Sequence, residues 1–456
     1  MSQEVVKGYK QTEIGSIPLD WQLKELRDVC IKIQDGNYGA FYPKSSEFIS
    51  YGVPFLTSKV LGKAGNINFN KVDYISNEKH KVLLKAHLEL NDVLFTNRGA
   101  SVGAIGYVDA RISNGNIGPQ LTLLRVNSFV DSLYLFQIMK SSWVQKQILS
   151  QDSGSAMNFF GVGATGKFKL PIPDNINEQK IIANILTDVD ALICELEKLI
   201  AKKQAIKTAT MQQLLTGKTR LPQFALRENG TIKGYKQSEL GEVPEDWDVK
   251  TYGEVFTFLS TSTNSRDDLS SDGDLGYIHY GDIHTKWNNR LDLDRQKLPK
   301  ISRNLVSSAL ILDGDLIMAD ASEDYQGIGK SVEIFNIRNK KIVAGLHTFL
   351  LRDKNKILAD GFRGYLHAIS TVKAAFDRLA TGLKVYGISK NNLTTIFLPV
   401  PSIEEQTAIA KILADMDSEI QALEKRLNKT RQIKQGMMQE LLTGKTRLVQ
   451  PEARGV

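Results

Sequence analysis

The chain has 456 residues, of which 42% are hydrophobic, and a formal net charge of +7. This length fits two or three domains with cores of their own, and the mild basicity permits nucleic-acid binding without establishing it. Two cysteines, Cys30 and Cys194, argue against a disulfide framework. Because neither a signal-peptide h-region nor an apolar run of roughly 18 residues is seen, we expect a cytoplasmic protein.

An internal repeat organises the chain. Residues 8–21 (GYKQTEIGSIPLDW) and 234–247 (GYKQSELGEVPEDW) are identical at nine of fourteen positions. LPIP begins at Leu170 and LPVP at Leu398, and LLTGKTRL begins at both Leu214 and Leu441. The paired segments begin 226, 228 and 227 residues apart, so the chain consists of two halves of roughly 227 residues.

The middles of the two halves, residues 30–169 and 256–397, show almost no matching. FTNRGASVGAIGYV and IMADASEDYQGIGKSV occupy similar places but share little beyond glycines. Short strands such as DVLFTNR, LTLLRV, DLIMAD and HTFLLR predict mixed domains, with helices over 131–149 and 360–380. We therefore expect the flanks to have the same function in both halves, whereas the two middles have different functions.

Each half ends in a predicted long helix, the first over residues 178–216. Prolines stand just before each helix, and apolar residues then recur at a/d spacing. A helix of ~39 residues at ~1.5 Å per residue extends ~58 Å, which is too long for a typical core helix. We expect the two helices to pair antiparallel about a pseudo-twofold axis; two separate helical hairpins are the alternative. The seam residues are Ile182, Ile185, Val189, Leu192, Leu196 and Leu199, then Ile409, Leu413, Met416, Ile420, Leu423 and Leu427.

The late parts of both predicted helices, residues 195–220 and 424–447, are basic. A solvated face is one interpretation, and a face opposite a phosphate backbone or an acidic partner is the other. Each late part ends in Gly-Lys-Thr, which is also how a nucleotide-binding P-loop ends. The first glycine of a P-loop is replaced by Gln212 and Gln439, and the run ends a helix instead of opening one. We therefore predict that Gly217 and Gly444 stop the helices in a left-handed conformation.

Other catalytic patterns are weak or absent from the sequence. GVGATG at residues 161–166 lacks the strand–turn–helix context of a dinucleotide site and predicts a flexible loop. There is no Pro-Pro for an adenine-methyltransferase loop, and the acidic pattern after Pro173 is too short for a nuclease metal motif. Six histidines and two cysteines show no metal-ligand spacing, and no G-x-S-x-G occurs. We expect no catalytic residue and no metal site, but a binding or scaffolding protein.

As a set, these features resemble the specificity (S) subunit of a type I restriction–modification system, over nearly the whole chain. The features are the two halves, the unlike middles, the Pro-x-Pro…Glu-Gln start of each helix and the LLTGKTRL run after it. DVLFTNRGASVGAIGYV also resembles a segment common in that family. The resemblance implies an α+β fold: two mixed α/β target recognition domains, joined by two long helices that form an antiparallel coiled coil with a pseudo-twofold repeat.

The resemblance also implies the function and the partners. We expect a non-catalytic, DNA-binding subunit of a bacterial or archaeal antiviral complex. Two modification (methyltransferase) subunits would supply the S-adenosylmethionine chemistry, and restriction subunits the ATP- and Mg-dependent translocation and cleavage. No cofactor is expected in this chain. The predicted segments are a repeated flank (1–29), recognition domain 1 (30–169), a central spacer helix (170–221), a linker with the second flank (222–255), recognition domain 2 (256–397), a distal spacer helix (398–448) and a tail (449–456).

Two unlike recognition domains at the ends of a rigid helical spacer predict a bipartite, asymmetric double-stranded DNA site with an unread gap. The length of the spacer gives the two domains a reach of order 17 base pairs. The competing hypotheses are an enzyme that uses the Gly-Lys-Thr run and a coiled-coil scaffold without a DNA role. Base edges are read by polar and charged loop residues, so we select candidates on that basis, an ordinary loop position being the alternative for each. They are Asn97, Arg98, Ser101, Asn158 and Lys167, then Tyr280, Asp282, His284, Asp320, Lys330 and Lys384.

Overall fold

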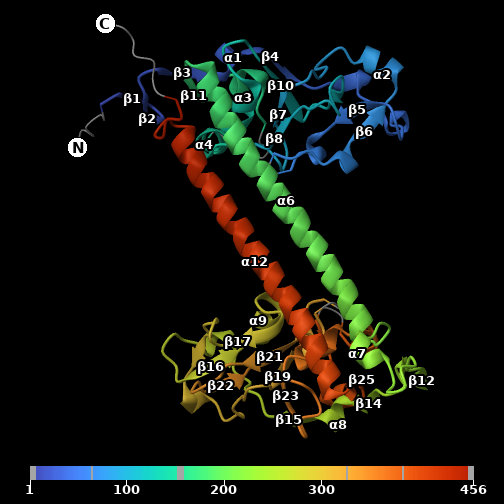
Figure 1. The fold of residues 1–456 in the computed structure, drawn as a ribbon. Helices are drawn as coiled ribbons and strands as arrows, with labels where there is room; N and C mark the ends of the chain where they lie inside the picture. Colours follow the sequence, from blue (N-terminus) through green and yellow to red (C-terminus); the bar gives the residue numbers. More distant parts are fainter. Residues whose placement is uncertain (1–6, 63–64, 151–158, 325–326, 383–384, 450–456) are drawn as a thin grey trace. The chain divides into compact units, whose positions relative to one another are not determined.

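The fold is that of a computed structural model, which describes residues 7–62, 65–150, 159–324, 327–382 and 385–449. The chain divides into two compact units. Unit 1 comprises Met1–Glu197 together with Lys425–Val456, and unit 2 comprises Lys198–Glu424. Two helices of 39 residues, α6 (Ile176–Leu214) and α12 (Ile403–Leu441), contribute to both units (Figure 1). Unit 1 is therefore formed by two separate parts of the chain, one before and one after unit 2.

Unit 1 is built on two small sheets. The first is antiparallel, in the order β4 (Cys30–Asp35), β10 (Leu121–Val126), β7 (Val93–Thr96) and β8 (Ile105–Tyr107). The second has the order β6 (Asp73–Ile75), β5 (Val53–Leu56) and β9 (Asn116–Ile117), with β5 and β9 parallel. Helices α3 (Ser132–Met139) and α4 (Ser142–Ser150) pack into the same core as Phe95 and Leu124.

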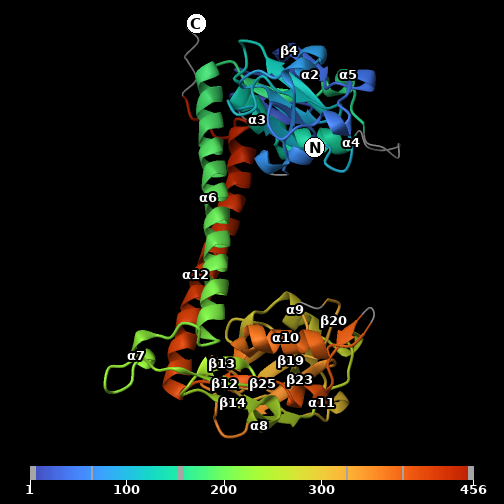
Figure 2. The same ribbon diagram turned by 90° about the vertical axis from the view of Figure 1, so that its right-hand side faces the viewer.

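Unit 2 repeats this topology with one additional strand. Its larger sheet has the order β15 (Phe256–Leu259), β23 (Thr348–Asp353), β19 (Leu316–Ala319), β21 (Ser331–Phe335) and β17 (Asn289–Asp292). Its smaller sheet has the order β18 (Lys300–Ile301), β16 (Leu275–Ile278) and β22 (Ile342–Ala344), with β16 and β22 parallel. Helix α10 (Ser370–Leu379), labelled in Figure 2, contributes Phe376 to the same core as Met318 and Leu351. Strand β17, which pairs parallel with β21, has no counterpart in unit 1.

The repeated flanks form the same elements in both units. Hairpins β1 (Tyr9–Thr12)–β2 (Gly15–Pro18) and β12 (Tyr235–Ser238)–β13 (Gly241–Pro244) come first. Next, β3 (Trp21–Glu25) pairs with β11 (Lys169–Pro173), and β14 (Asp248–Thr251) with β25 (Phe397–Val400). Each second strand leads directly into a long helix, because its prolines favour an extended chain and cannot be accommodated inside a helix.

The long helices run antiparallel in each unit. In unit 1, Asp190 and Glu197 of α6 pair with Lys434 and Arg431 of α12, so the partner number falls as the α6 number rises. In unit 2, Lys203 and Lys207 of α6 pair in the same falling order with Glu419 and Asp417 of α12. The predicted α+β fold with its internal repeat and antiparallel helix pair is confirmed. These ion pairs also account for part of the basic run, as contacts between the two helices.

The buried stripe on α6 differs from the predicted seam at two positions. Leu192 and Leu199 are 40% and 39% exposed, whereas Ile193 and Ile200 are buried. An α-helix turns once in 3.6 residues, so a stripe that starts at Ile182 drifts away from a strict 3.5-residue repeat and reaches Ile200 after five turns. Ile182 and Leu196 are buried, and Ile185 and Val189 are partly buried. On α12, Ile409, Leu413, Ile420 and Leu427 are buried, and Met416 and Leu423 are partly buried.

One loop prediction is wrong. GVGATG contains a single helical turn, α5 (Val162–Thr165), whose Thr165 is buried. The linker begins with α7 (Pro222–Ala225), where Pro222 stands at a position that lacks a helical hydrogen-bond partner in any case. Besides short 3-10 helices, the remaining short elements are α1 (Leu26–Val29), α2 (Asn77–Val82), α8 (Tyr252–Val255), α9 (Tyr280–Thr285), β20 (Ala321–Ser322), β24 (Tyr386–Gly387) and α11 (Lys390–Thr394).

Candidate nucleic-acid interface

A charged junction ties the end of α12 to the beginning of α6 in unit 1. The guanidinium of Arg447 donates to both oxygens of Glu178, at 2.7 and 2.9 Å, and to both oxygens of Asp20, at 2.9 and 2.7 Å. The indole N–H of Trp21 also donates to Glu178, at 3.3 Å. Burial opposes the charge of Arg447, but these hydrogen bonds outweigh it, so the pKa of Arg447 is raised. We call this set, with Gly444, junction 1.

Unit 2 contains the same junction, residue for residue. Arg220 donates to Glu405 through two bonds of 2.6 Å and to Asp246 at 2.8 and 3.1 Å. Trp247 donates to Glu405 at 2.9 Å. We call this set, with Gly217, junction 2. Both junctions use the LLTGKTRL run to close a unit, so the run has a structural role in each.

The glycines of the two runs have positive φ angles. Gly217 and Gly444 both have φ near +70°, as predicted for residues that end the helices. A Cβ atom at these positions would lie 2.4 Å from Cγ of Pro244 and of Pro18, respectively. Glycine is needed for its conformation and for the close approach of these rings. The run follows a helix in both units, so it is not a P-loop.

A second repeated contact joins the helix pair to each mixed domain. In unit 1, Asp190 of α6 binds Lys434 of α12 at 2.5 Å and Lys140, just after α3, at 2.8 Å. In unit 2, Asp417 of α12 binds Lys207 of α6 and accepts from the Tyr365 hydroxyl at 2.9 Å. Burial lowers the pKa of Lys140 to about 8, with Asp190 opposing the shift. Each aspartate therefore connects three elements of its own unit.

The unlike middles also share an ion pair between a buried aspartate and a partly exposed arginine, which the sequence comparison missed. Arg125 on β10 binds Asp92 at 2.8 and 2.9 Å, and Arg352 on β23 binds Asp315 at 2.8 and 2.6 Å. Each aspartate directly precedes the central strand next to its arginine. Aligning DVLF with DLIM and LLR with LLR would have revealed the pair. The two domains thus keep a common scaffold beneath different surfaces.

Unit 2 brings most of its predicted site residues together. The Tyr280 ring lies 6.1 Å from His284, and the backbone oxygen of His284 accepts from Lys330 at 2.9 Å. His347, which was not predicted, lies 5.4 Å from Tyr280 and places Nδ1 3.3 Å from Asp320. His279, also missed, lies 4.5 Å from Tyr280. His279 is the sequence neighbour of Tyr280, whereas no sequence signal marks His347, because the pairing of β19 with β23 brings it to Asp320 from far along the chain.

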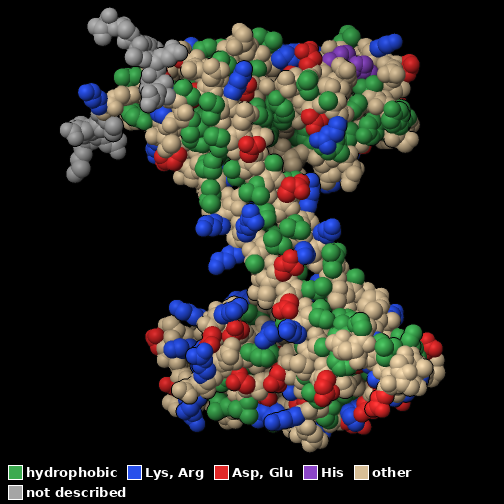
Figure 3. Space-filling view, in the orientation of Figure 1, with side chains coloured by type: hydrophobic (Ala, Val, Ile, Leu, Met, Phe, Trp, Pro, Cys, Tyr) green, Lys and Arg blue, Asp and Glu red, His purple; other side chains and the backbone are tan. Residues whose placement is uncertain are grey.

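Asp282 does not fit a base-reading role. Its carboxylate is buried and binds Arg266 at 2.9 Å and Lys286 at 3.0 Å, so it anchors α9. Lys384 lies outside the described residues. Lys286 also lines a cleft of about 460 Å³ beside α12, together with Arg290 and Arg295. Lys and Arg side chains gather on this face of unit 2, over β16, β17 and β22 (Figure 3).

Unit 1 places its predicted residues differently. Asn97 is fully buried and donates to Asp35 at 3.0 Å and to Thr122 at 2.9 Å, so it holds three strands together and cannot read a base. Arg98 is partly exposed, with its guanidinium 4.8 Å from the centre of the Phe159 ring. Ser101 is partly exposed in the β7–β8 loop, and Lys167 is exposed before β11. Asn158 lies outside the described residues.

The chain matches the family model of the type I restriction modification DNA specificity domain twice, over residues 18–208 and 244–434. The chain belongs to this family of specificity domains. The MjaX and MjaVIII specificity subunits of Methanocaldococcus jannaschii are 27% and 25% identical to it over 456 and 459 residues, with 97% of this chain covered in both cases and 97% and 96% of the relatives. The crystal structure of the type I restriction–modification S subunit from M. genitalium is 14% identical, has a TM-score of 0.55 and covers 92% of this chain and 96% of that one.

The family match confirms two repeated specificity domains in one restriction–modification specificity subunit. Each match contains one mixed domain and most of one long helix. In the described part of the chain, no group of three or more His, Cys, Asp or Glu side chains is arranged to hold a metal ion. No described helix is long and apolar enough to cross a membrane.

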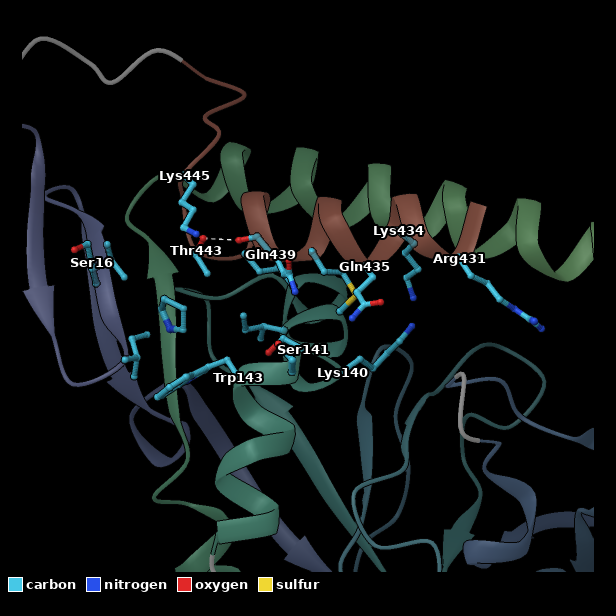
Figure 4. A pocket seen from close by; sticks show the side chains of 17 residues that line it. Ser16, Lys140, Ser141, Trp143, Arg431, Lys434, Gln435, Gln439, Thr443 and Lys445 are labelled. Carbon is cyan, nitrogen blue, oxygen red and sulfur yellow. Dashed lines mark hydrogen bonds between the residues drawn. The ribbon is translucent and has the colours of Figure 1, made fainter. Parts of the chain in front are cut away.

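The first specificity domain has a pocket of about 430 Å³ beside α12. Ile17, Trp143 and Met438 form apolar walls, and Figure 4 shows Lys140 and Lys434 converging at one end. The late part of α6 repeats the α12 wall in sequence, with Lys207, Met211 and Leu215 at the corresponding positions. The α12 side of the lining is therefore repeated in sequence in the two halves, whereas Lys140 and Trp143 belong to the unlike middle of the first half.

Proposed function

We propose that the chain recognises a bipartite, asymmetric DNA site, in which each specificity domain reads one half-site. The observation that carries this proposal is one topology with two different surfaces. After β7, unit 1 presents Arg98 over Phe159, and after the corresponding β19, unit 2 presents Asp320 beside His347. Two domains of one fold with different side chains at equivalent edges would read different bases, since base identity is read through specific donors and acceptors.

The antiparallel helices would separate the two half-sites. In each unit, ion pairs hold α6 against α12, and a central aspartate holds the pair to the mixed domain. A continuous helix transmits an insertion as a rise of ~1.5 Å and a rotation per residue. Inserting four residues into both helices at matched positions, near Glu197 and Lys425, should lengthen the unread gap. A gap that stays unchanged would rule out the spacer role.

The repeated part of each helix would bind partner subunits. Ile206 and Ile433 stand at corresponding positions and are 42% and 48% exposed, so the repeat leaves the same apolar side chain uncovered in both halves. Two equivalent surfaces fit two copies of one modification subunit, with the restriction subunits completing the complex. In this proposal those partners supply the S-adenosylmethionine, ATP and Mg chemistry, and this chain supplies none.

Exchange of one recognition domain tests the bipartite site. Residues 30–169 are replaced by the corresponding domain of a relative, and methylated sites are mapped in cells that also carry the modification subunit. We expect one half-site to change and the other to stay, with the reverse outcome for residues 256–397. A change in both half-sites from either exchange would contradict the proposal.

Counting bound subunits tests the docking surfaces. We expect Ile433→Asp and Ile206→Asp each to reduce two bound modification subunits to one, as measured by native mass spectrometry. Leu84→Asp is the matched control, because Leu84 is 83% exposed on a recognition domain and outside the repeated surface. Full occupancy in both isoleucine variants would exclude this surface.

A further inference from the structure

Three of the chain's six histidines gather at one edge of unit 2. His279 and His284 flank or belong to α9, and His347 precedes β23. Tyr280 contacts all three rings, and Asp320 lies against His347 at the end of β19. We call these five residues the imidazole–carboxylate cluster. It draws on three separate parts of the chain: the pairing of β19 with β23 brings Asp320 and His347 together, and α9 packs against β19.

Two of the three imidazoles are already committed to the backbone. The Nδ1 atom of His279 accepts from the N–H of Gly281 at 3.0 Å. The Nε2 atom of His284 donates to the carbonyl of Ala321 at 2.9 Å. These bonds fix the two rings, so they act as supports for Tyr280. His347 and Asp320 make no side-chain hydrogen bond within the described residues, apart from their own 3.3 Å approach.

His347 and Asp320 are also held where a ligand could reach them. The His347 side chain is 50% exposed and that of Asp320 is 27% exposed. His347 has a φ angle of +56°, a conformation that costs a non-glycine residue free energy and is concentrated at functional sites. Burial raises the pKa of Asp320, and His347 opposes this shift. Burial therefore disfavours the charged form of the Asp320 carboxylate. A half-buried acceptor with unused hydrogen-bonding capacity needs a donor from outside.

The equivalent edge of unit 1 has the opposite chemistry. Asn97 occupies the position after β7 that Asp320 occupies after β19. Its side-chain amide already donates hydrogen bonds to Asp35 and Thr122. The next residue, Arg98, is a permanent cation over an aromatic ring. One edge thus presents a donor and the other an acceptor. A donor at one edge and an acceptor at the other would let two recognition domains of the same fold select different bases.

We propose that the imidazole–carboxylate cluster reads an exocyclic amino group, cytosine N4 or adenine N6, in the half-site bound by unit 2. This inference rests on the proposed function. Asp320 accepts from the amino group, and a carboxylate repels the O6 of guanine and the O4 of thymine, which are acceptors at the same places in the major groove. His347 holds the carboxylate, and Tyr280 packs against His347. His347 and Tyr280 are therefore positioning residues, and Asp320 sets the specificity.

The test uses the full chain assembled with its modification subunit. Binding is measured to the mapped site and to a series in which each cytosine or adenine is replaced, one at a time, by an analogue without the amino group. We expect the wild-type complex to lose about tenfold to a hundredfold in affinity at one position of one half-site. Asp320→Asn should lose less than threefold there, because the asparagine amide can pair with acceptors as well as donors. Asp272→Asn, an exposed acid of the same unit, should match the wild type.

The outcomes separate the inference from the proposed function. If Asp320→Asn discriminates like the wild type at every position, the inference is overturned while a bipartite site still stands. If no second half-site exists, the proposed function itself fails. Should Asp320→Asn not assemble, His347→Ala replaces it. Weaker discrimination at the same position supports the inference, and wild-type discrimination overturns it.

Discussion

Replacing Arg447 with methionine removes the guanidinium of junction 1 and keeps the apolar stem of the side chain. Glu178, whose side chain is 1% exposed, would retain the Trp21 indole as a donor and lose two bonds to a cation. Removing one partner of a buried pair costs about 3–5 kcal/mol. Because Arg447 is 18% exposed and Trp21 still donates, we expect the lower end, about 3 kcal/mol.

Native-state hydrogen exchange with peptide resolution is the suitable assay, because it reports opening in each unit separately. About 3 kcal/mol corresponds to a loss of protection of roughly a hundredfold in unit 1. Arg220→Met, in the matched junction 2, should do the same in unit 2 and leave unit 1 unchanged. Adding Glu178→Gln to Arg447→Met should recover at least about 1 kcal/mol, because no unpaired charge then remains buried. Protection in unit 1 that changes less than threefold, or a Glu178→Gln change that deepens the loss, would refute this account.

Three further outcomes are expected. Gly444→Ala should destabilise unit 1 by at least about 2 kcal/mol in urea unfolding, because the left-handed backbone and the Pro18 ring both oppose a methyl group. The control is Gly163→Ala, which should cost little because no atom lies near the added methyl group. His367 is partly buried, and burial lowers its pKa from 6.5 to about 4. Between these values the unfolded state binds a proton that the folded state does not, so up to about 3 kcal/mol of stability is lost as pH falls through that window; unfolding from pH 7 to 4 should show a flatter profile for His367→Gln. A chain of residues 1–221 should form a dimer in sedimentation, because its own LLTGKTRL run can close junction 1 of a second copy; a monomer of intact fold would contradict the equivalence of the junctions.

Much of the architecture followed from repetition within the chain. Two copies of LLTGKTRL and of the Pro-x-Pro…Glu-Gln start located both long helices, and the first, predicted over 178–216, lies within two residues of the observed Ile176–Leu214 at each end. The left-handed glycines were predictable because Gly217 and Gly444 end an apolar helical pattern. The seam drifted at Leu192 and Leu199 because a heptad template assumes 3.5 residues per turn, and an α-helix has 3.6.

The candidate site depended on contacts that no local pattern encodes. The Asn97 side chain has the donor and acceptor groups of a base-reading residue, yet the neighbouring strands bury its amide against Asp35. His347 became a candidate only because β19 and β23 pair and bring it to Asp320. The sequence by itself determined the two halves, their helices and the closing role of the repeated run, since these depend on spacing along the chain. Only the tertiary structure decided that the two unlike middles share one topology and which polar residues face solvent, because burial is set by strands that are distant in sequence.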